Sequence, residues 1–190
     1  MTALPGALGS FEGMGLHPVG RFRIALGEVQ TVGSVAQGQR RVSLITGGRV
    51  EGPFFTGEVL PGGSDWQLIR GDGVVEIDAR FVVQLQEGGL LSVRNQGYRH
   101  GPPEVMAALA RGEQVPAHAY YFCSVLWFEA PEGRLSWLGK TLVLATGTRE
   151  GGEVRFEAAA MAHPGGASTK SLDLVRKPVD VPSPSGRGPG

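Results

Sequence analysis

The alternation of apolar and polar side chains over residues 74–86 constrains the fold of this chain more than any other feature. Alternate positions from 75 to 85 are apolar, and the positions between them include three charged residues. This two-residue period is typical of a β-strand with one buried face. A second apolar run, residues 66–70, precedes it across a Gly-Asp-Gly turn, and Asp-Gly tolerates the positive φ of a tight reversal. We therefore predict a β-hairpin here.

Strand-like runs recur along most of the chain and are interrupted once by a helical pattern. Residues 103–112 begin with Pro and an early acid and end with Arg and Gly, which is typical of a short helix. With the hairpin included, about eight or nine strands are expected, a number at which a sheet can close into a small barrel. The sequence therefore predicts an all-β fold, a single antiparallel β-barrel with one short helix. The other strand-like runs cover residues 21–26, 41–46, 57–60, 90–95, 119–129, 138–146 and 153–161.

The length and composition indicate a single domain with a segment on either side of it. We predict a loose leader over residues 1–19, a barrel domain over 20–163, and a tail rich in Pro, Gly and Ser over 164–190. A chain of 190 residues fits one such domain. Its 31 glycines and 13 prolines favour many turns over long helices.

Charge and hydropathy argue against several classes of function. The 18 Lys and Arg residues balance the 18 Asp and Glu residues, so there is no basic field for a nucleic acid. The first 20 residues lack the pattern of a secretion signal, and no run approaches the length of a membrane span. The single Cys123 lies in an apolar run, as expected of a buried thiol in a reducing compartment. We expect a cytoplasmic protein without nucleic-acid or membrane partners.

Several motifs, in order along the chain, resemble those of one family. They are GGRVEGP at 47–53, GEVLPGGSDW at 57–66, RGDGVVEIDARF at 70–81, NQGYRHGPPE at 95–104 and YYFCSVLWFEAPEGRLSWLGKT at 120–141, with Gly147. Over residues 22–161 the chain is similar to the bacterial and fungal family called domain of unknown function 3237, or uncharacterised protein family 0311. The resemblance implies a closed or nearly closed antiparallel barrel, calycin-like or allene-oxide-cyclase-like, with an inserted helix. It assigns no catalytic residue, and Lys140 departs from the Asn expected there.

The candidate catalytic residues are three acids, Glu51, Asp65 and Asp78. Carboxylates can divide acid and base roles where their surroundings separate their pKa values. If the strand face that carries Asp78 and Arg80 lines a barrel lumen, burial makes Asp78 a candidate base; if the apolar face lies inward, these charges are solvated. Asp65 follows a Pro-Gly-Gly turn, and it either caps that turn or lies with Trp66 and Asp78 around the barrel mouth.

The candidate ligand-binding residues combine aromatic rings, which supply shape, with cationic or polar groups, which fix orientation. They are Trp66, Arg80, Arg70, His100 and Tyr121. A histidine on a surface loop is the alternative interpretation of His100. The four histidines lack the spacing of a metal site, and the glycines form neither GxGxxG nor GxxxxGK[ST], so we predict no metal and no cofactor.

These features favour a barrel that binds a small, partly hydrophobic organic molecule and performs acid–base chemistry on it, such as isomerisation, cyclisation or hydrolysis. A non-catalytic ligand-binding or carrier barrel needs the same pocket, but no group that titrates near neutral pH. A solidly packed structural or oligomeric barrel is the third hypothesis. The aromatic run over residues 120–128 is most simply core or subunit interface, with a ligand wall as the alternative. A small organic molecule is the expected partner, and a homo-oligomer is left open.

Overall fold

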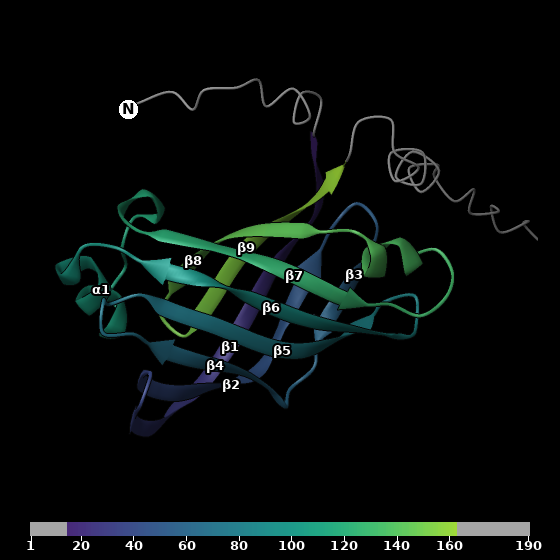
Figure 1. The fold of residues 1–190 in the computed structure, drawn as a ribbon. Helices are drawn as coiled ribbons and strands as arrows, with labels where there is room; N and C mark the ends of the chain where they lie inside the picture. The colour runs from purple at the N-terminus through teal and green to yellow at the C-terminus, as the bar shows by residue number, and fades with distance from the viewer. Residues whose placement is uncertain (1–14, 163–190) are drawn as a thin grey trace, which may run out of the picture.

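Residues 15–162 form a nine-stranded antiparallel barrel with one α-helix at one end (Figure 1). The computed structural model describes residues 15–162. The predicted all-β barrel is therefore confirmed, and α1 (Pro103–Ala110) lies within the predicted helical residues. Two 3₁₀ turns, η2 (Ala117–Ala119) and η3 (Ser136–Lys140), flank β7. The strands are β1 (Gly15–Val35), β2 (Gly38–Glu51), β3 (Thr56–Val59), β4 (Gly63–Ile69), β5 (Val75–Leu85), β6 (Leu90–His100), β7 (Tyr121–Glu129), β8 (Val143–Glu150) and β9 (Glu153–Ala162).

Pairing between neighbouring strands closes the sheet into a ring. From β1 the order runs through β9, β8, β7 and β6 to β5. The short strands β3 and β4 share the next place in the ring, because each pairs with β5 on one side and with β2 on the other. β2 then pairs with β1, which completes the closure. Each strand of such a ring turns alternate side chains toward the interior and toward the outside.

The first and last described strands pair with each other. β1 begins at Gly15, so residues 15–19, which we expected in the leader, belong to this strand and pair with the end of β9. The predicted tail over 164–190 lies outside the described residues. None of the helices within residues 15–162 combines the length and apolar content needed to cross a bilayer.

The apolar face of β5 points into the barrel. Every second side chain from Val75 to Leu85 is buried, whereas Asp78 is partly exposed and Arg80 exposed on the other face. The alternation that predicted this strand therefore also fixes its orientation, since transferring its apolar face from water into the core is favourable. Of the two orientations that the sequence left open, the one with Asp78 and Arg80 on the outer face is correct.

Aromatic rings fill the middle of the barrel interior. Phe22 stacks on Phe156 with 4.6 Å between ring centroids. It also makes edge-to-face pairs with Phe55 at 6.5 Å and Phe81 at 6.4 Å. Aromatic pairs of this kind contribute about 0.5–1.5 kcal/mol each beyond the area they bury. The rings come from β1, β5, β9 and the β2–β3 connection, so their contacts join opposite walls of the barrel.

Helix α1 covers the end of the barrel at which β5 begins and β6 ends (Figure 1). Its residue Leu109 is buried in a second apolar cluster with Val75, Ile77 and Phe122. The helix starts at Pro103, where the missing N–H of proline costs no hydrogen bond. Its packing separates this end of the interior from solvent.

Gly97 lies where β6 and β7 approach too closely for a side chain. A Cβ atom at this position would overlap the backbone oxygen of Cys123 and the Cβ of Ser124. We expect Gly97→Ala to lower the free energy of unfolding by about 2 kcal/mol or more, because overpacking forces the paired strands apart. Urea unfolding followed by circular dichroism measures this change.

Gly71→Ala is the matched control, since nothing lies within 4 Å of a Cβ built there. Its free energy of unfolding should stay within about 0.5 kcal/mol of the wild-type value. Equal effects of the two substitutions would contradict the close approach of β6 and β7.

Candidate functional site

A row of polar side chains crosses the interior in the half of the barrel next to α1. Ser43 on β2 is paired with Asp65 on β4. Asp65 is paired in turn with Ala79 on β5, and Ala79 is paired with Asn95 on β6. Directly paired residues of neighbouring strands point to the same side of a sheet. Ser43, Asp65 and Asn95 are all buried, so this shared side is the inside.

A chain of hydrogen bonds connects Asp65 to a cation. Arg41 Nε donates to Gln67 Oε1 at 2.8 Å, and Gln67 Nε2 donates to Asp65 Oδ2. Asp65 is 7% exposed, and its Oδ1 has no hydrogen-bond partner within residues 15–162. The carboxyl group is therefore held through one oxygen, while the other remains available in the interior.

Two further arginines lie at this end of the barrel. Arg99 is 3% exposed and its guanidinium carbon lies 5.6 Å from the ring centroid of Phe122. The backbone N–H of Arg149 donates to Tyr120 Oη at 2.9 Å, which ties β8 to the segment before β7. Neither Arg99 Nε nor Arg149 Nε has a hydrogen-bond partner among the described residues.

Burial shifts the pKa values of Asp65 and Arg99 in this cluster. It raises the pKa of Asp65, and the hydrogen bond from Gln67 and the charges of Arg99, Arg41 and Arg149 oppose the shift. Burial, with repulsion from Arg149 and Arg41, lowers the pKa of Arg99 to about 10. At neutral pH Arg99 therefore stays charged, and Asp65 holds its proton more readily than an exposed aspartate does.

A small cavity adjoins this row. Its volume is ≈ 20 Å³, which is room for about one water molecule. Asp65 and Asn95 are its polar lining residues, and both have an oxygen without a partner in the described part of the chain. The remaining lining is apolar: Ile24, Leu26, Ile45, Ile77, Ala79, Phe81, Phe122, Val154 and Phe156.

Asp65, Trp66 and Asp78 do not meet at a barrel mouth, so that prediction is wrong. Trp66 follows Asp65 directly on β4, so it points outward and is 50% exposed. Asp78 also lies on the outer face, where Arg94 Nε and an Arg94 terminal nitrogen donate to its two oxygens at 3.0 and 2.8 Å. Its position follows from register, because Asp65 is paired with Ala79 and not with Asp78.

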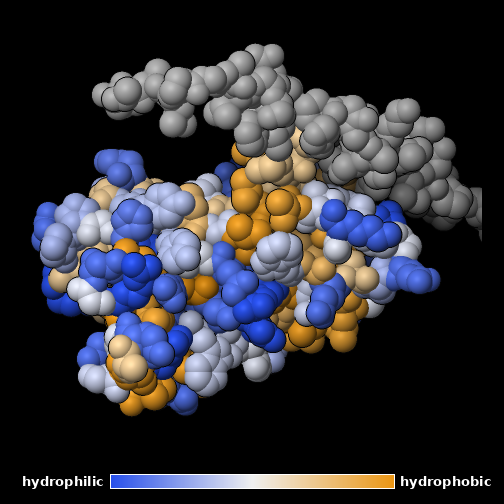
Figure 2. Space-filling view, in the orientation of Figure 1, coloured by the Kyte–Doolittle hydropathy of each residue, from blue (hydrophilic) through white to orange (hydrophobic). Residues whose placement is uncertain are grey.

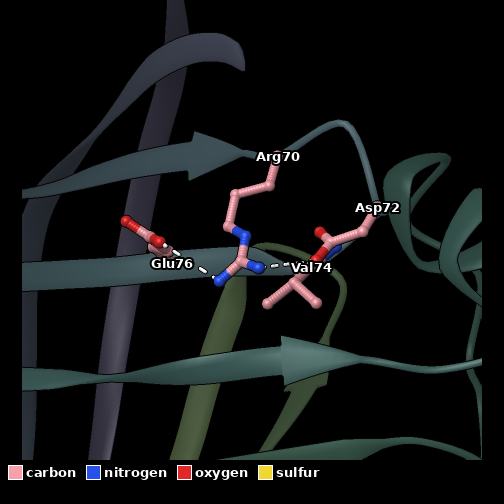
Figure 3. Close-up of polar contacts among 4 residues, drawn as sticks. All are labelled: Arg70, Asp72, Val74 and Glu76. Carbon is pink, nitrogen blue, oxygen red and sulfur yellow. Dashed lines mark hydrogen bonds and ion pairs between the residues drawn. The ribbon is translucent and has the colours of Figure 1, made fainter. Parts of the chain in front are cut away.

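The remaining charged candidates also lie outside the barrel. Arg70 contacts Asp72 at 2.6 Å and Glu76 at 3.6 Å, and Asp72 accepts the backbone N–H of Val74 (Figure 3). These contacts lie at the β4–β5 turn, so they stabilise the hairpin. Arg80 is exposed on β5.

Glu51 is exposed at the end of β2, where it forms an ion pair with Arg49 at 2.8 Å. The preceding residue, Val50, is buried, so Glu51 points outward. Glu51 and Asp65 therefore lie on opposite sides of the sheet and do not form a carboxylate pair.

His100 and Tyr121 stack on each other across β6 and β7, with 4.8 Å between ring centroids. Tyr121 borders a groove of ≈ 930 Å³ on the outer face of β1 and β6–β9, which Glu51 also lines. Figure 2 shows apolar side chains gathered over the part of the sheet that contains β8 and β9. Trp66 and Asp78 line a smaller outer hollow of ≈ 390 Å³.

Within residues 15–162, no three His, Cys, Asp or Glu side chains lie close enough to hold a metal ion.

Sequence reasoning missed most of the interior cluster. Of its members only Asp65 was a candidate, whereas Arg41, Gln67, Asn95 and Arg99 were not. The signal in the sequence was the two-residue alternation along β6. Asn95 and Arg99 occupy the same alternate positions as the buried Leu91 and Val93, so they point inward. A polar residue at an inward position of a barrel strand is therefore the pattern that would have found them.

The fold and the interior cluster define an antiparallel β-barrel of the size that encloses side chains or one small ligand. A family model described as "Protein of unknown function (DUF3237)" matches residues 14–161. The chain belongs to this family, and the resemblance seen in the sequence motifs is confirmed.

Relatives with known sequences and structures agree with this assignment. The chain is 34% identical over 129 residues to the UPF0311 protein RPA1785 of Rhodopseudomonas palustris, an alignment that covers 68% of this chain and 84% of that protein. The crystal structure of RPA1785, a conserved protein of unknown function, matches with a TM-score of 0.74 at 29% identity, covering 78% of this chain and 98% of that one.

Two other solved structures share the fold. A beta-barrel like protein from Acinetobacter baumannii matches with a TM-score of 0.69 at 31% identity, covering 85% of this chain and 100% of that one. An enzyme from Penicillium herquei matches with a TM-score of 0.58 at 16% identity, covering 84% and 99%. At that identity the second match concerns the fold alone.

Asp65 and Asp78 should respond to pH in opposite directions. From about pH 4 up to its raised pKa, folded Asp65 keeps a proton that the unfolded chain has released, so the free energy of unfolding falls as pH rises. The hydrogen bonds from Arg94 lower the pKa of Asp78, so Asp78 adds stability above its unfolded pKa and loses it as pH falls.

We therefore expect Asp65→Asn to gain stability relative to the wild type between about pH 4 and pH 7. Asp78→Asn should be less stable than the wild type by a nearly constant amount above about pH 4, and this difference should shrink as the pH falls below the unfolded pKa of aspartate. Urea unfolding at a series of pH values measures both differences. The same pH trend for the two variants would contradict the inside and outside positions of these acids.

Proposed function

We propose that this protein is a barrel that binds a small, partly hydrophobic organic molecule at its interior polar cluster and performs acid–base chemistry on it. The observation that carries the proposal is a group of five buried polar atoms without hydrogen-bond partners among the described residues. They are Ser43 Oγ, Asp65 Oδ1, Asn95 Oδ1, Arg99 Nε and Arg149 Nε. Buried polar groups in native proteins are nearly always paired, so such a concentration favours a site that a ligand completes.

Asp65 is the proposed general base. Burial raises its pKa toward the range in which a carboxylate exchanges protons effectively near neutral pH. Gln67 holds one carboxyl oxygen, so the other can be directed at a substrate proton. Asp65 is therefore both oriented and accessible to a molecule inside the barrel.

Arg99 and Arg149 are the proposed stabilisers of negative charge. Removal of a proton beside a carbonyl group leaves an oxyanion, and donors fixed in a dry interior stabilise such a charge more than water does. Return of the proton from Asp65 to a different atom completes an isomerisation. In a cyclisation the enolate carbon first attacks an electrophilic carbon of the same molecule, and the proton from Asp65 then goes to the atom that takes up the negative charge. Hydrolysis needs a positioned water in addition, and the cavity beside Asp65 has room for one.

Access to this site requires side chains to move. The ≈ 20 Å³ cavity is far smaller than an organic substrate. Leu26 and Val154, which line it, and Met106 on α1 are only partly buried, and they pack against the surrounding core clusters. We propose that substrate enters by displacing these side chains. Compatibility of the fold with catalysis is supported by the enzyme from Penicillium herquei, with which only the fold is shared.

A metabolite library screened by thermal shift tests the proposal, since a ligand that binds the native state raises Tm by mass action. Each compound that raises Tm is then incubated with the protein, and its conversion is followed by mass spectrometry. We expect Asp65→Asn to lower turnover by about 100-fold or more, the usual contribution of a general base. Asp78→Asn makes the same chemical change on the outer face and should leave turnover at the wild-type level. Unchanged turnover in Asp65→Asn would overturn the proposal.

The outer groove supports a second candidate, a carrier without catalysis. Its volume of ≈ 930 Å³ lies in the range of small-molecule pockets, and Leu16, Leu144 and Ala159 give it an apolar floor with Tyr98 and Tyr121 beside them. If the carrier proposal is right, Leu144→Gln weakens binding of the library compounds, whereas Asp65→Asn leaves it unchanged. Self-association of the chain stays a prediction.

A further inference from the structure

The interior cluster carries an excess of positive charge. The positive charges of Arg41, Arg99 and Arg149 repel one another, and Asp65 is the acid whose negative charge opposes this repulsion. With Asp65 ionised, the three cations and one anion leave two positive charges; with Asp65 protonated, they leave three. Charges in a protein interior are normally paired, because taking an unpaired charge out of water is costly.

One buried donor on each of two arginines, Arg99 and Arg149, also lacks an acceptor among the described residues. A guanidinium carries five N–H donors in a planar fork and no acceptor. Arg99 is 3% exposed, yet its Nε has no partner within residues 15–162, and Arg149 Nε is in the same state. The guanidinium carbon of Arg99 lies 5.6 Å from the ring centroid of Phe122. The cluster thus has two buried Nε–H donors for which the described residues supply no acceptor.

We propose that the ligand of the interior site is a small organic anion, a carboxylate with a hydrocarbon body, whose oxygens accept hydrogen bonds from Arg99 and Arg149. This inference rests on the proposed function, since it names the ligand class of the same site. A carboxylate matches the planar fork of a guanidinium with two parallel hydrogen bonds.

The cavity lining favours a carboxylate over inorganic phosphate. Apart from Asp65 and Asn95 the lining is apolar, with Ile24, Ile45 and Phe156 among its members. A hydrocarbon body gains free energy by contact with such a surface, whereas phosphate offers only polar oxygens. The carboxylate binds Arg99 and Arg149, whose charges act on Asp65 although they do not line the cavity, and the hydrocarbon body occupies the enlarged cavity beside Asp65.

The test measures binding of matched probes to the full-length protein by isothermal titration calorimetry at constant ionic strength. The probes are acetate, isobutyrate and benzoate, the corresponding neutral amides, and inorganic phosphate. We expect each carboxylate to bind at least about tenfold more tightly than its amide, because a charge-assisted hydrogen bond is lost in the amide. We also expect isobutyrate or benzoate to bind more tightly than phosphate. Equal binding of acids and amides by the wild type would overturn the inference, and tighter binding of phosphate would overturn the carboxylate assignment.

Three variants locate the binding. Arg99→Met should weaken carboxylate binding by at least about tenfold, because the buried fork is removed. Arg80→Met removes an exposed arginine from the outer face of β5 and should leave binding unchanged. Asp65→Asn removes the opposing negative charge and should tighten carboxylate binding roughly threefold or more. Weakening by Arg80→Met that equals that of Arg99→Met would contradict an interior anion site.

The two proposals fail in different ways. If acids bind selectively but Asp65→Asn retains full turnover, the acid–base function fails and the anion site stands. If acids and amides bind alike while Asp65→Asn loses turnover, the anion inference fails and Asp65 remains the base.

Discussion

Closure of the sheet is the constraint on which the rest of the molecule depends. Once β2 pairs with β1, each strand must turn alternate side chains into one enclosed space. A residue's place in its strand then decides whether it packs in the core or faces outward. For a polar residue the two positions differ strongly in free energy, because an inward-facing group is removed from water and needs a hydrogen-bond partner inside the barrel.

The interior divides into an apolar part and a polar part under this constraint. The ring of Phe22 joins Phe55, Phe81 and Phe156 in the apolar part. In the half next to α1, several inward positions are Ser, Asp, Gln, Asn and Arg, beside the apolar cluster that packs on the helix. Rigid packing in the first part holds the strands whose continuations position the polar side chains in the second. The apolar cluster therefore acts as the scaffold of the candidate site.

Local sequence patterns predicted the strands well but located only one residue of the site. The alternation over residues 74–86 predicted β5 and its turn, since both depend on neighbours in sequence. Asp65 and Asp78 were equally good candidates in the sequence, yet one lies inside and the other outside. What separates them is the register of β4 against β5, which pairs Asp65 with Ala79. The alternation on β5 already assigns Asp78 to the outer face, but β4 has no such alternation, because apolar Trp66 points outward and polar Asp65 and Gln67 point inward. The inward position of Asp65 follows only from this register, which the hairpin turn sets.

The cost of the polar cluster is the strongest argument that it has a function. Replacing buried ionic groups by well-packed apolar residues is often neutral or stabilising, so a barrel that needed only stability would have no use for Arg99 at an inward position. Its burial lowers its pKa, and its Nε lacks a partner in the described part of the chain, so the charge of Asp65 and the ring of Phe122 offset the cost of burying Arg99 only in part. The ion pair of Asp78 and Arg94 on the outer face has a small desolvation cost, because both side chains are partly solvated. Buried polar groups without partners are uncommon in native proteins, and a ligand that supplies acceptors to Arg99 and Arg149 would pair the two found here.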